Sequence, residues 1–147
     1  MSELNDLYQE LIIDHSKRPR NFQRLQEPKQ TTQGYNPLCG DKITLDVKLE
    51  NGHIGEIGFQ GSGCAISTAS ASLMTESVKG KTLQEADMLF EKFHSLITSE
   101  TADPSGMGKL AVFSGVREFP ARAKCATLAW HTLRAALQER GTPVSTE

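Results

Sequence analysis

Cysteine is scarce in this sequence. Three cysteines occur among 147 residues, at positions 39, 64 and 125. An odd number of cysteines that lie far apart argues against a disulfide framework and favours reduced thiols. We therefore expect a cytoplasmic protein, and we consider each thiol as a candidate ligand.

The sequence also lacks a long apolar run and a strong excess of charge. Residues 1–10 are largely polar and acidic, so no secretory signal is expected, and no apolar segment approaches the length of a membrane span. A formal net charge of −2 gives no reason to expect nucleic acid or an anionic membrane as a partner. With 37% hydrophobic residues, the 147 residues suit one domain, which we place at 1–147 with a disordered tail from about residue 141.

The most informative stretch is Cys39-Gly40-Asp41. In an extended chain, residues i and i+2 point to the same side, so the thiol of Cys39 and the carboxylate of Asp41 can face one point. Gly40 can adopt the unusual backbone angles that bring the two side chains together. A soft thiolate and a hard carboxylate directed at one point suggest a metal ion. Alone, the tripeptide is weak evidence because it also occurs by chance.

A hairpin follows this motif. Apolar and polar residues alternate over 43–49, as in a strand with one buried face, and Asn51-Gly52 is a strong hairpin signal. The return strand over 54–59 changes phase, and Gly55 or Gly58 could hold a bulge there. The hairpin places the Cys39 end of the first strand beside the segment that leads into Cys64. We therefore expect Cys39, Asp41 and Cys64 to lie near one another.

Cys64 precedes a helical pattern that ends near Gly80. The free N–H groups and the dipole of a helix N-terminus stabilise a thiolate and lower its pKa. Glycines on both sides of Ser62 allow the backbone to come close to a bound group. Cys64 is therefore placed as a reactive or ligating thiol.

The remaining elements are mostly helical. We expect a helix over 2–16, a connection with one short strand over 20–36, a helix that begins at the capping box of Thr82 and Glu85, and a loop over 99–109. A last helix is expected from about Glu118 to Arg140. Its core stripe is predicted to comprise Phe119, Ala123, Ala126, Trp130, Leu133 and Leu137.

Cys125 lies one residue from that stripe, near the cations Arg122 and Lys124. A thiol at the edge of a buried face and beside cations is suited to ligation or chemistry. With it, the chain offers four ligands of the S₃O type, a set that satisfies tetrahedral zinc without a water: Cys39, Asp41, Cys64 and Cys125. The alternative is that one or more of the cysteines are small buried hydrophobes. None of the four histidines, His15, His53, His94 and His131, has a partner at ligand spacing.

A carboxylate and a thiol beside a flexible glycine suggest a site from which one ligand can leave. The thiolate of Cys39, once released, is a nucleophile. Metal binding would then protect the thiol and organise the site.

Three stretches of the sequence resemble one family, the SufU proteins, which form the zinc-binding branch of the IscU-like iron–sulfur assembly proteins. The stretches are Asn36-Pro37-Leu38-Cys39-Gly40-Asp41, Gly61-Ser62-Gly63-Cys64-Ala65-Ile66-Ser67, and Phe119-Pro120-Ala121-Arg122-Ala123-Lys124-Cys125-Ala126-Thr127-Leu128. The resemblance implies an α+β fold in which a small antiparallel β-sheet packs against several helices. It also implies that the metal ligands are Cys39, Asp41, Cys64 and Cys125.

Two features separate the sequence from the scaffold branch of this family. Scaffold proteins carry a histidine just before the last cysteine, where this chain has Lys124, and residues 82–110 resemble an insertion typical of SufU. The resemblance therefore implies zinc-dependent sulfur transfer in iron–sulfur cluster assembly. Cys39 would accept persulfide sulfur from a cysteine desulfurase of the SufS type and pass it to the downstream SUF machinery. The alternatives are a scaffold that binds a transient [2Fe–2S] cluster on the same ligands, and an adaptor whose zinc serves only folding.

Overall fold

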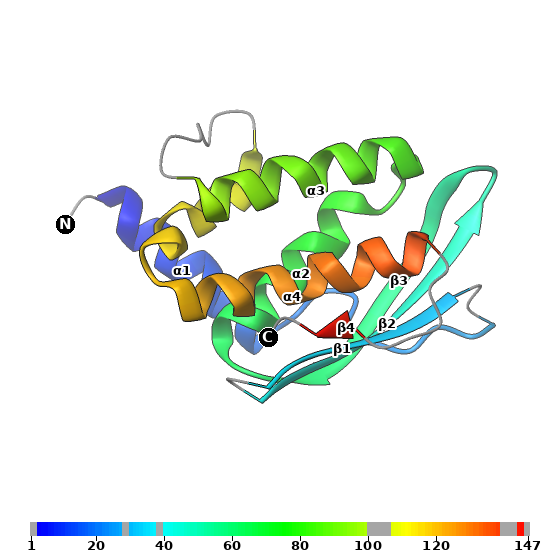
Figure 1. Ribbon diagram of the computed structural model, residues 1–147, viewed down its shortest axis with the longest axis horizontal. Helices are drawn as coiled ribbons and strands as arrows, with labels where there is room; N and C mark the ends of the chain where they lie inside the picture. The colour runs from blue at the N-terminus through cyan, green and yellow to red at the C-terminus, as the bar shows by residue number, and fades with distance from the viewer. Residues whose placement is uncertain (1–2, 28–29, 38–39, 100–106, 139–143, 146–147) are drawn as a thin grey trace.

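The computed structural model describes residues 3–27, 30–37, 40–99, 107–138 and 144–145. Its fold is α+β, as predicted, and Figure 1 shows the helices gathered on one side of a small sheet. The elements in chain order are α1 (Glu3–Lys17), β1 (Gln30–Asn36), β2 (Asp41–Glu50), β3 (His53–Ser62), α2 (Ala65–Val78), α3 (Leu83–Thr98), the 3₁₀-helix η1 (Gly108–Glu118), α4 (Pro120–Leu137) and β4 (Val144–Ser145).

The sheet has the strand order β3-β2-β1-β4. Strands β1, β2 and β3 pair antiparallel, so the short strand expected within 20–36 is β1. Strand β4 pairs parallel with β1 beside Gly34 and Tyr35. The sequence predicts a disordered tail from about residue 141, and of this tail the structure describes Val144 and Ser145, which form β4. The outer edge of β1 offers unpaired backbone groups, which these residues satisfy.

The β2–β3 hairpin turns at Asn51 and Gly52, whose φ angles of 52° and 79° are those of a type I′ turn. The register shifts between Lys48 and Leu49, where Gly55 is the extra residue of β3. This bulge returns the apolar side chains of Ile54 and Ile57 to the same buried face. The predicted change of phase is thereby confirmed.

The helices form two layers over the sheet. Figure 1 shows α2 and α4 between the sheet and α3, and α2 and α4 contact both the strands and each other. Helix α4 approaches β1 so closely that a Cβ atom added at Gly34 would lie 2.1 Å from Oγ1 of Thr132. The aromatic core joins the outer elements to α4: the rings of Phe93 and Trp130 stack with centroids 4.6 Å apart, and Phe113 of η1 meets Phe93 edge-on.

The structure corrects the sequence-based description of the region before α4. Part of the predicted loop, residues 100–106, lies outside the described residues, but Gly108 begins a 3₁₀-helix that the sequence analysis did not predict. Three of its buried residues, Leu110, Phe113 and Val116, recur at every third position, which is the 3₁₀ period, and Ala111 and Val112 are buried beside them.

Helix α4 begins at Pro120 rather than at about Glu118. Phe119 is extended, with φ −128° and ψ 92°, as the residue before a proline tends to be. The side chain of Phe119 is also 48% exposed, so its predicted place in the core stripe is wrong. No helix within the described ranges combines the length and apolar character needed to cross a bilayer.

Candidate metal centre

Asp41 is the first residue of β2 and lies opposite Asn36 of β1. Its carboxylate is fully buried. The oxygen Oδ1 accepts a hydrogen bond of 2.9 Å from the backbone N–H of Cys64. The second oxygen, Oδ2, is buried and has no hydrogen-bond partner among the described residues. A buried carboxylate oxygen without a donor is costly unless another positive group compensates it, so Asp41 fits a cation.

Cys64 is the N-cap residue of α2, as the sequence predicts. Its Sγ atom accepts a hydrogen bond of 3.4 Å from the backbone N–H of Ser67, and its side chain is exposed. A Cβ atom at Gly63 would lie 2.5 Å from Oδ1 of Asp41, so this position requires a glycine for the loop to pass the carboxylate.

Cys125 belongs to α4 and is only 2% exposed. Its Sγ atom accepts a hydrogen bond from Nδ2 of Asn36 at 3.6 Å. The sequence placed Cys125 at the edge of the buried face, and the structure places it inside, where it faces the start of β2. Asn36 was not predicted as a site residue, although it stands three positions before Cys39 in the family-like motif.

These three residues form one group. The candidate ligand atoms of Asp41, Cys64 and Cys125 all lie within 4.8 Å of one another. Two sulfurs on one tetrahedral zinc lie about 3.8 Å apart, because each Zn–S bond is about 2.3 Å long. The separations are therefore close to those of a ligand set, and two thiols with a partnerless buried carboxylate oxygen suit a metal of the zinc type.

The fourth predicted ligand, Cys39, lies outside the described residues. The described residues on either side of it support the loop: the N–H of Gly40 donates to the backbone oxygen of Asn36 at 2.9 Å, and Gly40 has a φ of +73°. A side chain would strain that backbone conformation. The positive φ fits the predicted use of Gly40 as the flexible member of the motif.

The predicted cations take different positions around the site. Lys124 is half-buried, whereas Arg122 is exposed and its guanidinium lies 4.8 Å from the ring centroid of Phe119. That arrangement is a cation–π contact on the surface of α4.

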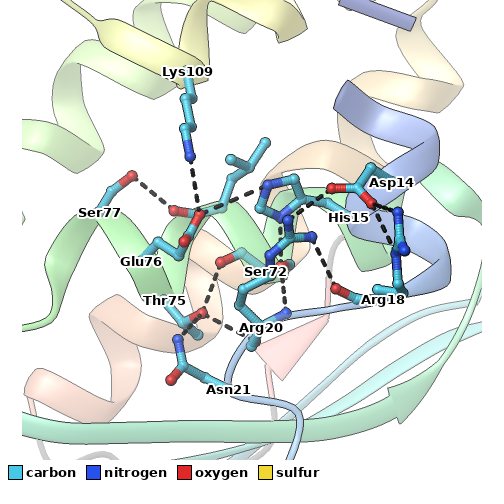
Figure 2. A network of polar contacts seen from close by, with 11 residues as sticks. Asp14, His15, Arg18, Arg20, Asn21, Ser72, Thr75, Glu76, Ser77 and Lys109 are labelled. Atoms are coloured by element: carbon cyan, nitrogen blue, oxygen red, sulfur yellow. Dashed lines mark hydrogen bonds and ion pairs between the residues drawn. The ribbon is translucent and has the colours of Figure 1, made fainter. Parts of the chain in front are cut away.

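None of the four histidines joins the group of candidate ligands. His15 of α1 belongs to a separate polar network, where Nδ1 is 2.7 Å from Oγ of Ser72 and Nε2 is 3.7 Å from Oε1 of Glu76. Figure 2 shows this network between α1 and α2. His94 and His131 meet each other on α3 and α4, with ring centroids 5.8 Å apart.

A fold of this kind with a mixed cysteine and aspartate group is that of an iron–sulfur cluster assembly domain. Residues 7–126 match the model of the NifU-like N-terminal domain, and the chain belongs to this family. The resemblance noted in the sequence is thereby confirmed.

The similar proteins come from both branches of the family. The chain is 42% identical to the iron–sulfur cluster assembly scaffold protein IscU of Streptococcus pyogenes serotype M1, over 94% of this chain and 87% of that protein. It is 40% identical to the zinc-dependent sulfurtransferase SufU of Bacillus subtilis, over 90% of each. A crystal structure of a candidate scaffold protein for the SUF system from Fervidobacterium islandicum is 34% identical, with a TM-score of 0.82 over 87% of this chain and 94% of that one.

Proposed function

We propose that this protein is a zinc-dependent sulfurtransferase of iron–sulfur cluster assembly. It accepts persulfide sulfur on Cys39 from a cysteine desulfurase of the SufS type and passes it to the SUF machinery in the cytoplasm. Its metal ligands are Cys39, Asp41, Cys64 and Cys125. The observation that carries the proposal is the group of two thiols and one buried carboxylate within 4.8 Å, in which Oδ2 of Asp41 has no partner among the described residues.

The chemistry follows from the thiol chosen as acceptor. Gly40, the residue after Cys39, has a backbone φ of +73°. Release of the Cys39 thiolate from the ligand set would make it available as a nucleophile. The Cys39 thiolate attacks the terminal sulfur of the desulfurase persulfide. A new S–S bond forms, the S–S bond of the desulfurase breaks, and the electron pair leaves on the desulfurase thiolate. No external oxidant or reductant is needed.

The other residues of the site prepare this step. Asp41 and the N-terminus of α2 hold Cys64 in place through the 2.9 Å hydrogen bond from its N–H. Cys125 is buried, so its thiol is shielded from solvent and from competing thiol exchange. Zinc, when bound, would keep the ligating thiols deprotonated and tie the loop to α2 and α4.

A scaffold for a transient [2Fe–2S] cluster is the second candidate function. It is favoured by the 42% identity to a scaffold protein and by the thiol content of the site, since cysteine thiolates hold such clusters. Lys124 weighs against it, because the scaffold branch has a histidine at this position that can serve as a ligand.

The test is the cysteine turnover of the cognate desulfurase with the zinc-loaded, demetallated and zinc-restored protein. Strong stimulation by the two zinc forms alone is the expected result. With ³⁵S-cysteine, label should appear on the wild-type protein and be absent from Cys39→Ser. The matched control is Ser62→Ala, which changes an exposed residue at the end of β3 and should label as the wild type does.

Two outcomes would overturn this proposal. An undiminished rate of sulfur acceptance in Cys39→Ser would exclude Cys39 as the acceptor. A turnover that zinc does not change or suppresses, together with cluster formation by the iron-loaded protein, would establish the scaffold function instead.

A further inference from the structure

Asn36 connects the separate parts of the candidate metal centre. It is the last residue of β1, its side chain is fully buried, and it lies opposite Asp41 in the antiparallel register. Its backbone oxygen accepts from the N–H of Gly40 at 2.9 Å, which closes the loop that contains Cys39. Its side chain donates to Sγ of Cys125 at 3.6 Å, across 89 residues of sequence. One residue therefore contacts both the loop and a ligand from α4.

The chemistry of the amide makes this contact more than packing. An Asn side chain cannot lose a proton near neutral pH, and its N–H dipole points its positive end at the sulfur. A sulfur that carries negative charge in a buried place is stabilised by such a donor, and an N–H bond to an ionised acceptor is stronger than one to a neutral acceptor. The donor also fixes the direction in which the remaining lone pairs of the sulfur point.

We propose that Asn36 is a positioning residue, which orients the Cys125 thiolate toward the metal and tunes its strength as a donor. The inference rests on the metal centre of the proposed function but not on sulfur transfer. Partners of this kind, which touch a ligand and not the metal, affect metal affinity by about 10–100-fold in other proteins. Hydrogen bonds to ligating sulfurs also shift the electronic properties of the bound metal.

The experiment uses Co²⁺ as the probe, because a tetrahedral cobalt site with thiolate ligands has a sulfur-to-cobalt charge-transfer band and separate ligand-field bands. The full-length protein is loaded with Co²⁺ under anaerobic conditions. Asn36→Leu removes the donor at similar volume, and Asn36→Ser is a smaller variant for the case that leucine prevents folding. Both variants should shift the charge-transfer band to lower energy, because a sulfur without its donor gives up an electron more easily.

Cobalt affinity, measured by competition with a chelator, should fall about tenfold in the same variants. The ligand-field bands should keep their tetrahedral intensity, because the ligands themselves remain. The matched control is Thr32→Val on the same buried face of β1, where Oγ1 has no hydrogen-bond partner among the described residues. This control should leave band position and affinity as in the wild type.

Two results would overturn the inference. The first is a folded Asn36 variant with an unmoved band and unchanged affinity. The second is a loss of affinity with an unmoved band, which would mean that Asn36 only fills space. Sulfur transfer does not enter the measurement, so a failure of Cys39 as acceptor and a failure of Asn36 as donor are separate results.

Discussion

Two aspartates of β2, Asp41 and Asp46, have the same burial and opposite surroundings. Both side chains are fully buried. Asp46 accepts from Nε of Arg24 at 2.7 Å, from Oγ1 of Thr31 at 2.7 Å and from the N–H of Leu25 at 2.9 Å. Burial alone would raise the pKa of Asp46, but these hydrogen bonds outweigh it and the pKa lies below its usual value.

Asp41 has no such set of donors. One oxygen accepts a single backbone hydrogen bond, and the other has no hydrogen-bond donor in the described part of the chain, while the sulfurs of Cys64 and Cys125 lie within 4.8 Å of the carboxylate. Burial alone therefore does not separate a structural carboxylate from a functional one. What distinguishes the two is whether a carboxylate oxygen remains without a hydrogen-bond donor from the protein.

The largest effect on stability is expected at Asp46. Asp46→Asn removes the charge that Arg24 and Thr31 bind and puts an amide N–H₂ group among donors, which should lower the free energy of unfolding by about 3 kcal/mol. Urea unfolding of the demetallated protein measures this. A cost below about 0.5 kcal/mol would show that the contacts on the outer face of the sheet are dispensable.

The hydrogen bonds of Asp46 also make the stability of the protein depend on pH in acid. Because the pKa of Asp46 is lowered on folding, its contribution is present above the unfolded value of about 3.9 and is lost as the pH falls through the folded pKa.

The matched variant, Asp41→Asn, should have a smaller effect than Asp46→Asn, and it should change zinc affinity rather than the stability of the metal-free protein. The demetallated variant should be as stable as the wild type or more stable, because a buried carboxylate oxygen without a partner is removed. Zinc affinity, measured by chelator competition, should fall by roughly tenfold or more, which is about 1.4 kcal/mol or more. Unchanged zinc affinity would remove Asp41 from the ligand set, and a large loss of stability in the metal-free protein would abolish the contrast with Asp46.

His15 extends the comparison to a buried histidine, for which we expect the smallest effect on stability. It is fully buried, with one ring nitrogen bonded to Ser72 and the other only near Glu76 (Figure 2). Burial lowers its pKa, as does the charge of Arg20, whereas Glu76 and Asp14 oppose the shift and Lys109 adds to it.

Protonation of His15 in acid should therefore destabilise the docking of α1 on α2. The contribution of neutral His15 to the free energy of unfolding is present above the unfolded pKa of about 6.5 and decreases as the pH falls below it. Urea midpoints between pH 7.5 and 5 measure this for the wild type and for His15→Gln, which should lose part of the slope. His131→Asn is the comparison: burial also lowers the pKa of His131, so this variant should likewise lose part of the slope. An unchanged slope in His15→Gln would assign the pH dependence to other groups.

The sequence predicted the features that depend on neighbours in the chain. The Asn51-Gly52 turn, the bulge near Gly55 and the N-cap position of Cys64 follow from local backbone preferences. The capping box of Thr82 and Glu85 is also present, with hydrogen bonds of 3.0 and 3.1 Å. These local features bring Asp41 and Cys64 together, because the hairpin and the helix start are both short-range structures.

The features that the sequence did not predict depend on distant contacts. The 3₁₀-helix η1 has a weak pattern of its own and is fixed by Phe113 packing against Phe93 of α3. The pairing of Val144 with β1 and the donation from Asn36 to Cys125 join segments that only the complete fold brings together. The family-like motif contained Asn36, but nothing in the local sequence distinguished its side chain from that of any other strand-end residue.

The position of Cys64 at the start of α2 has a practical use. Its sulfur accepts a hydrogen bond from the N–H of Ser67, so any change in the charge or the bonding of that sulfur alters the field at one particular amide proton. The amide resonance of Ser67 is therefore a built-in spectroscopic reporter on the state of the thiol. It requires no label at the cysteine itself and leaves all the candidate ligands unmodified.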